Sequence, residues 1–269
     1  MSGLGKFLRR KEMTKIAFPE WQNEVVAQAI DEVKSEFTPA EFESVSCENL
    51  EAALVAVREG IADAMIAGID YTSRDIILAT RDIVGASGST FSASFLFEKN
   101  GQKIVVGDCA ACKNPTEDQL FEIVLQTTET ARRLLDEEPR VALLSFSTLG
   151  SGGKDPSIER AQNVVSKLHS EYPEMVVDGE MQLDAAVNPA VAAKKAPDSP
   201  VAGRANVLIA PDLNSGNILY KSLEQFGGFT AAGPLLQGFK APVSDLSRGS
   251  TKDDVKLVIK TMLKLVGTK

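Results

Sequence analysis

The sequence predicts an α/β fold made of two α/β domains with mainly parallel sheets. Short apolar runs alternate along the chain with longer amphipathic stretches, which is the pattern of strands and helices in turn. No internal repeat or low-complexity tract interrupts this alternation. A chain of 269 residues is also long enough to bury two cores of moderate size.

The N-terminal part is predicted to alternate strands and helices as far as Val84. The apolar segments 15–18 and 64–67 favour strands, and each is ended by a residue that interrupts regular structure, Pro19 or Gly68. Helices are predicted over 22–34, 50–59 and 72–84, because apolar residues recur there with helical spacing.

The middle of the chain begins with a predicted β-hairpin. The segments 90–97 and 103–106 are rich in β-forming residues, and Asn100-Gly101 between them is a strong hairpin-turn signal. The segments that follow are predicted as helix 115–135, strand 141–146, helix 157–169, short helix 189–195, strand 205–209, loop 211–216, helix 217–226 and, near the C-terminus, amphipathic helix 255–266.

The change of character after Val84 predicts the domain organisation. We expect residues 1–84 and 228–269 to form one discontinuous domain, and residues 85–227 to form a second domain inserted into it. A cleft is expected between the two.

Composition excludes several classes of protein. A net charge of -8 argues against a nucleic-acid-binding protein, because phosphate backbones need a basic face. No apolar run reaches the roughly 18 residues of a membrane span, and residues 1–13 lack the apolar core of a secretory signal, so they are expected to be a solvated arm. Three cysteines are too few for a disulfide framework and fit a reducing, cytoplasmic setting.

The cysteines and the lone histidine allow few metal or nucleophile sites. Cys109 and Cys112 could form a redox pair, although two small buried thiols are the favoured interpretation. Cys47 and His169 are the only other soft ligands, so no metal site is expected. A general base is therefore expected to be a carboxylate.

The segment 245–255 is the most informative for chemistry. Ser247, Arg248 and Gly249 precede a helix, whose free N–H groups and partial positive charge favour an anion. Arg248 adds a cation that can bind an oxyanion with two hydrogen bonds. A structural interpretation also stands, because Thr251 and Asp254 have the spacing of a capping box.

Two further loops follow predicted strands. Ser147 and Thr148 come after the strand 141–146, and Asn217 begins the helix after the loop 211–216. Ligands of α/β sheets bind at the carboxyl ends of strands, so both loops are candidate binding segments.

Taken together, these stretches resemble the phosphate acetyltransferase (phosphotransacetylase) family, roughly over residues 60–266. The matching segments are Val105-Val-Gly-Asp-Cys-Ala, Leu143-Leu-Ser-Phe-Ser-Thr, Asp178-Gly-Glu-Met-Gln-Leu-Asp, Ser199-Pro-Val-Ala-Gly-Arg-Ala-Asn, Pro211-Asp-Leu-Asn-Ser-Gly-Asn, Gly233-Pro-Leu-Leu-Gln-Gly and Pro242-Val-Ser-Asp-Leu-Ser-Arg-Gly. The last two are similar to the acetyl rather than the butyryl branch.

The resemblance implies reversible transfer of an acetyl or other short acyl group between coenzyme A and phosphate, giving acetyl phosphate, in acetate metabolism. Coenzyme A is then a substrate, no cofactor is tightly bound, no metal takes part in the chemical step, and the chain is expected to form a homodimer. Asp254 would act as the base toward the thiol, Arg248 would hold phosphate or polarise the acyl carbonyl, and Ser247 would hydrogen-bond the transition state. The implied substrate-binding residues are Thr72, Ser73, Arg74, Arg81, Ser147, Thr148, Asn217, Gly249 and Ser250.

The sequence departs from the family pattern near its start. The stretch between the first strand and Ala64 is short, and it offers no match for one substrate-contacting arginine of the family. Two further family arginines fall on Val25 and Leu78. We expect Arg74 or Arg81 to compensate for the second, because both lie three or four residues from Leu78 on a helix. The alternative is a non-catalytic module, in which the shortened N-terminal domain leaves a cleft that binds acyl-CoA or acyl phosphate.

Overall fold

The computed structural model describes residues 13–38 and 41–267, so the expected N-terminal arm lies outside the described residues except for Met13. The chain forms two compact units, Met1–Gly85 with Lys240–Lys269, and Ala86–Phe239. The return to the first unit comes at Lys240 rather than at the expected 228. The reason is a strand over Thr230–Gln237, which pairs antiparallel with Ser92–Lys99 of the second unit.

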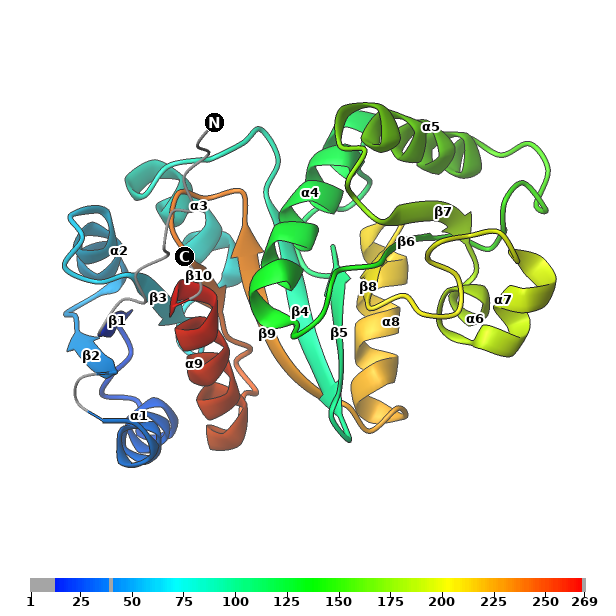
Figure 1. The fold of residues 1–269 in the computed structure, drawn as a ribbon. Coiled ribbons are helices and arrows are strands. Elements are labelled where there is room, and N and C mark those ends of the chain that lie inside the picture. The colour runs from blue at the N-terminus through cyan, green and yellow to red at the C-terminus, as the bar shows by residue number, and fades with distance from the viewer. Residues whose placement is uncertain (1–12, 39–40, 268–269) are drawn as a thin grey trace, which may run out of the picture. The chain divides into compact units, whose positions relative to one another are not determined.

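The first unit is built on four parallel strands. They are β1 (Thr14–Phe18), β2 (Phe42–Ser46), β3 (Ala64–Ala67) and β10 (Val243–Asp245), in the order β2-β1-β3-β10. The helices are α1 (Glu24–Glu36), α2 (Leu50–Arg58), α3 (Ser73–Ile83) and α9 (Lys252–Gly267) (Figure 1). Since parallel strands end at one edge, the loops after β1, β3 and β10 meet there.

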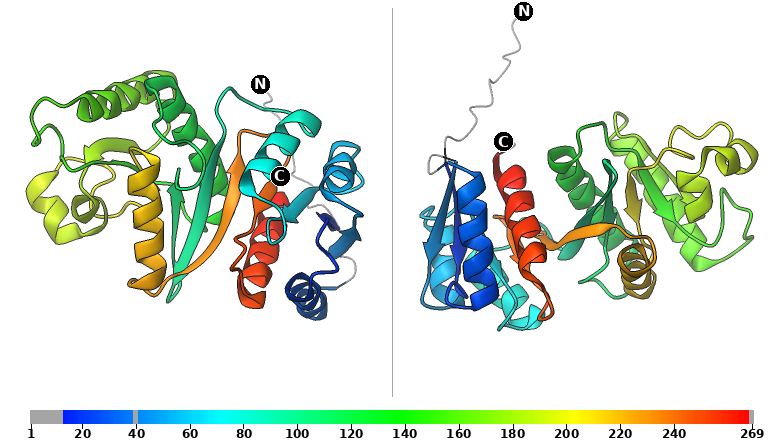
Figure 2. Two further views of the ribbon diagram at one scale, coloured as in Figure 1. Left: turned by 180° about the vertical axis from the view of Figure 1, so that it is seen from behind. Right: turned by 90° about the horizontal axis from the view of Figure 1, so that it is seen from below.

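Helix α9 is attached to α1 by apolar packing and by ion pairs. The two helices lie side by side in Figure 2. Glu32 of α1 pairs with both Lys252 and Lys256, and these lysines hold the pKa of the Glu32 carboxyl at about 2. The pair with Lys252 fixes the first residue of α9, so the ion pairs also place the start of that helix.

The second unit contains a mixed sheet in the order β9-β4-β5-β8-β6-β7. Strands β9 (Thr230–Gln237), β4 (Ser92–Lys99) and β5 (Gln102–Gly107) are antiparallel neighbours, whereas β5, β8 (Val207–Ile209), β6 (Val141–Leu144) and β7 (Val177–Met181) run parallel. The predicted turn joins β4 and β5, with Asn100 and Gly101 both at positive φ.

Helices cover both faces of this second sheet. They are α4 (Glu117–Leu134), α5 (Pro156–Glu171), α6 (Leu183–Val187), α7 (Pro189–Lys195) and α8 (Leu213–Gln225). Figures 1 and 2 show α4 on one face and α8 on the other. The mostly parallel α/β architecture predicted from the sequence is therefore confirmed within each unit.

Gln237, part of the family-like segment Gly-Pro-Leu-Leu-Gln-Gly, is a buried structural residue at the end of β9. Its amide donates to Ser94 Oγ at 3.0 Å and to Thr130 Oγ1 at 2.7 Å, and its side-chain oxygen accepts from Ser92 Oγ at 2.8 Å. These bonds satisfy polar groups that would otherwise be costly to bury. The motif therefore joins β9 to β4 and α4.

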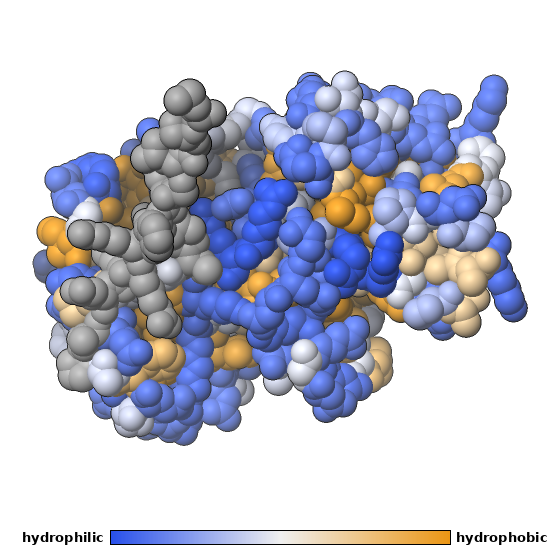
Figure 3. Space-filling view, in the orientation of Figure 1, coloured by the Kyte–Doolittle hydropathy of each residue, from blue (hydrophilic) through white to orange (hydrophobic). Residues whose placement is uncertain are grey.

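The face of the molecule in Figure 3 is mostly hydrophilic, with smaller apolar areas between the charged residues. Within residues 13–38 and 41–267, no helix combines the length and the apolar character that crossing a bilayer would need.

Candidate active site

The loop between β10 and α9 holds Ser247, Arg248 and Gly249 in a tight turn. The Ser250 N–H donates to Ser247 O at 2.9 Å, and the Gly249 N–H donates to Ser247 Oγ at 3.3 Å. The Ser247 hydroxyl therefore accepts one bond and keeps its own hydrogen for a ligand. Arg248 is exposed, and it makes no hydrogen bond or ion pair with any residue that the structure describes. An unpaired guanidinium before a helix start is suited to binding an oxyanion.

Asp254 lies in the first turn of α9 and caps the helix, as its spacing from Thr251 predicted. Its Oδ2 accepts from both the backbone N–H and the Oγ1 of Thr251, each at 2.8 Å, while the Asp254 N–H donates back to Thr251 Oγ1 at 3.3 Å. Capping uses only one carboxylate oxygen, and Oδ1 has no partner among the described residues. The cap therefore fixes the carboxylate and leaves one oxygen available for proton transfer.

The loop between β3 and α3 carries the other predicted ligands of the first unit. Thr72 caps α3, where its Oγ1 accepts from the Asp75 N–H and donates to Asp75 Oδ2 at 2.7 Å. Ser73 and Arg74 follow in the first turn, and Arg74 has no partner within residues 13–38 and 41–267. Arg81 lies in the last turn and pairs with Asp82 at 2.8 Å. Arg74 is thus the arginine nearer to the carboxyl ends of the strands.

Glu20 holds the β3–α3 loop through backbone bonds. It follows β1, is only 5% exposed, and accepts the N–H groups of four consecutive residues: Gly68 and Ile69 on Oε2 at 2.9 and 3.2 Å, and Asp70 and Tyr71 on Oε1 at 2.5 and 3.2 Å. This residue was not predicted as functional. Its burial depends on contacts with residues about fifty positions away, which spacing alone does not show.

Asp245 is a second buried carboxyl, and it precedes the Ser247–Arg248 turn. It ends β10, is paired in register with Ala67 of β3, and is 4% exposed. Burial raises the pKa of its carboxyl to about 6, the effect of the Ser73 hydroxyl opposes this shift, and the charge of Glu20 adds to it. Its Oδ1 has no hydrogen-bond partner among the described residues.

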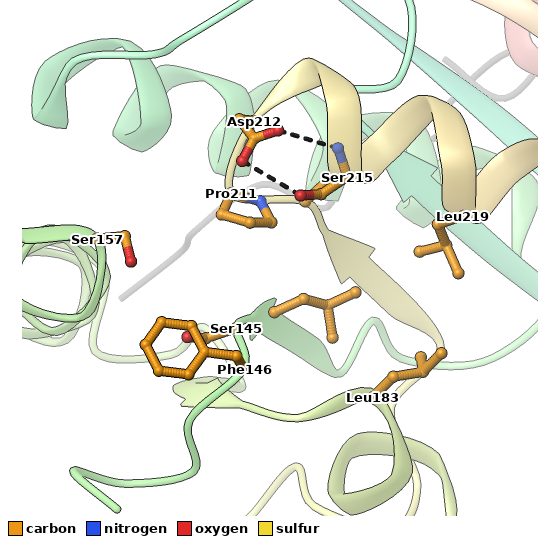
Figure 4. A pocket seen from close by; sticks show the side chains of 10 residues that line it. Ser145, Phe146, Ser157, Leu183, Pro211, Asp212, Ser215 and Leu219 are labelled. Atoms are coloured by element: carbon orange, nitrogen blue, oxygen red, sulfur yellow. Dashed lines mark hydrogen bonds between the residues drawn. The ribbon is translucent and has the colours of Figure 1, made fainter. Parts of the chain in front are cut away.

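The second unit contains a cavity of about 370 Å³ (Figure 4). It lies beyond the carboxyl ends of β6 and β8, and it is lined by Leu144, Ser145, Phe146, Ser157, Leu183, Ala210, Pro211, Asp212, Ser215 and Leu219. Asp212 caps α8, accepting from the N–H and the Oγ of Ser215 at 2.9 and 3.2 Å. This is the edge of the sheet where ligands of α/β proteins bind.

The predicted ligands of the second unit do not line this cavity. The Ser147 hydroxyl donates to Glu180 Oε1 at 2.7 Å and accepts the Gly152 N–H at 2.8 Å, both inside the protein. Thr148 Oγ1 likewise accepts the Gln182 N–H at 3.0 Å. Asn217 is exposed one turn into α8. The binding roles of these three residues remain predictions, whereas Ser145 and Phe146 of the same motif do reach the cavity.

Comparison with known proteins decides the family. A family model described as phosphate acetyl/butaryl transferase matches residues 15–262. The chain belongs to the phosphate acetyl/butaryl transferase family. The resemblance predicted from the sequence motifs is thereby confirmed.

Named relatives of this transferase-family chain agree with the match. Phosphate acetyltransferase of Treponema pallidum is 42% identical over 216 residues, and that of Clostridium acetobutylicum is 40% identical over 215; each alignment covers 77% of this chain and 64% of the relative. The chain thus spans a little under two thirds of the length of these relatives. A crystal structure of a phosphotransacetylase from Streptococcus pyogenes superposes with a TM-score of 0.85 at 30% identity, covering 96% of each chain.

The cysteines of this transferase-family chain are placed for packing rather than for thiol chemistry. Cys109 is fully buried, and burial raises the pKa of its thiol well above the usual value. Burial also raises the pKa of Cys112, whose thiol is half-buried, and the nearby Asp108 adds to the effect. Both thiols are therefore held in the unreactive protonated form. In the described part of the chain, His, Cys, Asp and Glu do not form a group of three that could hold a metal ion.

The raised pKa of Asp245 predicts a pH-dependent stability. Between about pH 4 and 6 the folded chain binds a proton that the unfolded chain does not, so the free energy of unfolding falls as pH rises through this window. The full effect is about 3 kcal/mol, because each pKa unit is worth 1.36 kcal/mol. We expect Asp245→Asn to raise the free energy of unfolding by about 1–3 kcal/mol at pH 7 and to leave it unchanged near pH 4.

Urea unfolding of the wild type and Asp245→Asn at both pH values checks this expectation. Asp31→Asn, an exposed change on α1, is the control and should show no such difference. Equal stability of wild type and Asp245→Asn at pH 7 would mean that the buried carboxylate carries no penalty.

Proposed function

We propose that this chain is an enzyme that moves an acetyl or other short acyl group between coenzyme A and inorganic phosphate. The observation that carries the proposal is the turn Ser247–Arg248 leading into α9, with an unpaired guanidinium, a free hydroxyl hydrogen and one free oxygen of Asp254. Support also comes from the relatives named phosphate acetyltransferase. The proposed setting is acetate metabolism in the cytoplasm, with the chain acting as a homodimer.

The chemistry proposed for the turn uses each of its groups. Asp254 accepts the proton of the coenzyme A thiol, and the sulfur attacks the carbonyl carbon of acetyl phosphate. The bond from that carbon to the bridging oxygen breaks, and its electron pair leaves with phosphate. Arg248 stabilises the negative charge that develops, and the Ser247 hydroxyl donates to the oxygen of the tetrahedral intermediate. Reversal of the same steps gives acetyl phosphate.

Phosphate binding is proposed for the β3–α3 loop of the same unit. Arg74 has no partner among the described residues, whereas Arg81 is engaged by Asp82. Arg74 is therefore the better candidate to replace the family arginine that falls on Leu78. Thr72 and Ser73 precede it, and Gly249 and Ser250 belong to the neighbouring turn; all four are proposed as ligand contacts.

The proposal is tested by following acetyl-CoA formation from coenzyme A and acetyl phosphate, with Asp254→Asn as the decisive variant. Asparagine can still accept the Thr251 N–H, so the helix cap remains while the base is lost. We expect turnover to fall by about 10²- to 10⁴-fold. Asp253→Asn, one residue earlier in the same turn, is the matched control and should retain wild-type turnover.

The outcomes separate the proposed enzyme from the alternative. Wild-type turnover that is lost in Asp254→Asn and kept in Asp253→Asn supports the transferase. Binding of coenzyme A without turnover on acetyl, propanoyl or butyryl phosphate would instead support a ligand-binding module. Light scattering of the purified chain tests the proposed homodimer separately.

A further inference from the structure

Glu20 joins the segment after β1 to the segment after β3 at the carboxyl edge of the first sheet. Its own carbonyl accepts the Asn23 N–H at 2.9 Å, which closes a turn before α1. Its buried carboxylate accepts the N–H groups of residues 68–71 at 2.5 to 3.2 Å. Asn23 adds a second link, because its side-chain amide donates to Asp70 Oδ2 at 3.3 Å. The loop after β3 is therefore fixed from the side of β1.

The loop that Glu20 fixes leads directly to Arg74. Tyr71 donates the last of the four N–H groups, the next residue is the N-cap of α3, and Arg74 lies in the first turn. The Arg74 guanidinium has no partner among the described residues, so no side chain there sets its place. The position of Arg74 therefore depends on the backbone of the loop, and through it on Glu20.

The same loop lies against the residue that precedes the Ser247–Arg248 turn. Gly68, the first residue bonded to Glu20, is so close to Leu246 that an added Cβ would lie 2.3 Å from the Leu246 carbonyl oxygen. The Leu246 N–H also donates to Ala67 O at 2.6 Å. Glu20 thus fixes the stretch of backbone that lies between Arg74 and the turn.

We propose that Glu20 is a positioning residue, whose four backbone bonds set the place of Arg74 relative to the Ser247–Arg248 turn and so the affinity for phosphate. It acts through the main chain without touching the ligand. Displacing a substrate-positioning group by about 1 Å can lower the rate by about 10²-fold, so such support matters to function. The inference rests on the proposed function, because it takes inorganic phosphate to be a substrate held by Arg74.

Glu20→Ala tests the proposal with acetyl-CoA and inorganic phosphate as substrates, by following CoA release. Alanine removes all four acceptor bonds, so the loop can move and Arg74 with it. We expect the phosphate KM to rise about tenfold, while the KM for acetyl-CoA stays at the wild-type value. A general loss of structure would change both constants, so the difference between them is the readout.

Formate should restore the function of Glu20→Ala, because its two oxygens can replace those of the missing carboxylate. The four N–H groups are left without acceptors in this variant, and converging N–H groups bind small anions. We expect formate to lower the raised phosphate KM toward the wild-type value, and chloride at equal ionic strength to leave it raised. The phosphate KM of the wild type should not fall when formate is added.

Trp21 reports formate binding without any need for turnover. It is the only tryptophan in the sequence, it follows Glu20 directly, and its side chain is 40% exposed. Formate should change the fluorescence emission of Glu20→Ala and leave that of the wild type unchanged, since Glu20 already occupies the four donors there.

Asp108 provides a matched control in the second unit. It is 3% exposed and, like Glu20, accepts four backbone N–H groups, at 2.6 to 3.2 Å, from Ala93, Ala110, Ala111 and Cys112. Asp108→Ala should lower the urea midpoint as Glu20→Ala does, and it should leave the phosphate KM unchanged. An equal rise of the phosphate KM in both variants would mean that lost stability alone causes it, and would overturn the inference.

Glu20→Gln decides the question if the alanine variant does not fold. Glutamine keeps one acceptor oxygen for the loop, so we expect the phosphate KM to rise about threefold. A wild-type phosphate KM in whichever of these two variants folds overturns the inference, and so does a raised KM in Glu20→Ala that formate does not lower.

The outcomes distinguish this inference from the proposed function. If the wild type turns over and the Glu20 variants keep its phosphate KM, the inference is overturned while the transferase stands. If the wild type does not turn over, the proposed function fails. Calorimetric titration with inorganic phosphate then decides the inference: weaker binding by Glu20→Gln than by the wild type supports it, whereas equal binding, or none by the wild type, overturns it.

Discussion

Arg248→Ala is expected to lower turnover of coenzyme A and acetyl phosphate by about 10²- to 10³-fold, with little change in stability. The arginine is exposed and unpaired in the described structure, so the fold loses no contact when it is removed. The proposed reaction loses the hydrogen-bond donor that stabilises the negative charge developing on the transferred group. Removing one such donor commonly lowers kcat by about 10²- to 10³-fold. Surface changes away from caps and cores alter the free energy of unfolding by only about 0.5 kcal/mol.

The measurement is kcat and KM for both substrates, together with the urea midpoint. Arg248→Lys keeps the charge but not the two-pronged hydrogen bonding, so it should fall between wild type and alanine. Arg58→Ala, which removes an exposed arginine paired with Glu59 on α2, is the control. Wild-type kcat in Arg248→Ala would show that this guanidinium does not act in the transfer step.

Gly68→Ala should destabilise the chain by about 4 kcal/mol or more and abolish turnover as well. An added Cβ would lie 2.3 Å from the Leu246 carbonyl oxygen and 2.4 Å from the Leu246 nitrogen, and Gly68 has a φ of +128° that other residues rarely adopt. The backbone of Leu246 must move to relieve the contact. Since Ser247 and Arg248 follow directly, the turn proposed to be catalytic must move with it.

Gly60→Ala is the control that separates the cost of a positive φ from the cost of a steric clash. Gly60 also has a positive φ, +73°, but nothing lies within 4 Å of an added Cβ. It should cost only about 1–2 kcal/mol and leave turnover at the wild-type level. Urea unfolding and soluble yield compare the two variants, and equal midpoints would contradict the close approach of Gly68 to Leu246.

The sequence predicted elements best where the local pattern and the packing agree. The strands 64–67 and 141–146, the Asn100-Gly101 hairpin and the long helix after Pro115 all appear, with ends shifted by a few residues. Strand β9 was missed because Gly233 and Pro234 interrupt its pattern. In the structure these residues lie at a register shift in the pairing with β4, where a proline can be accommodated.

Tertiary contacts also override local propensity at the start of α8. The segment 211–216 was predicted as a loop, since asparagine, serine and glycine are weak helix formers. The helix nevertheless starts at Leu213, and Asp212 caps it. Gly216 is needed there because an added Cβ would lie 2.2 Å from the Asp108 carbonyl oxygen. The glycine that weakened the helix prediction is the residue that lets the helix approach β5.

The residues of the candidate site also differ in whether the local sequence or only the tertiary structure reveals them. Ser247, Arg248 and Asp254 were predicted because they lie within one short segment, 245–255, at a helix start that resembles a family motif, and their roles stay predictions. Glu20 and Asp245 could not, because their importance comes from burial beside strands that are distant in sequence. An acidic residue beside a motif does not by itself indicate a special role in the sequence. The structure is needed to show that its carboxylate is buried.

Glu20 has a consequence for how the first unit can recognise an anion. Four successive backbone N–H groups converging on one point form a ready-made receptor for a negative ion, and here the protein supplies that ion itself. The proposed phosphate substrate would therefore find these four N–H groups already occupied by Glu20. Anion binding at the β3–α3 loop must then come from groups other than these four N–H donors, such as the Arg74 guanidinium, which a single substitution can replace. We therefore expect the anion preference of the β3–α3 loop to be open to change by point substitution.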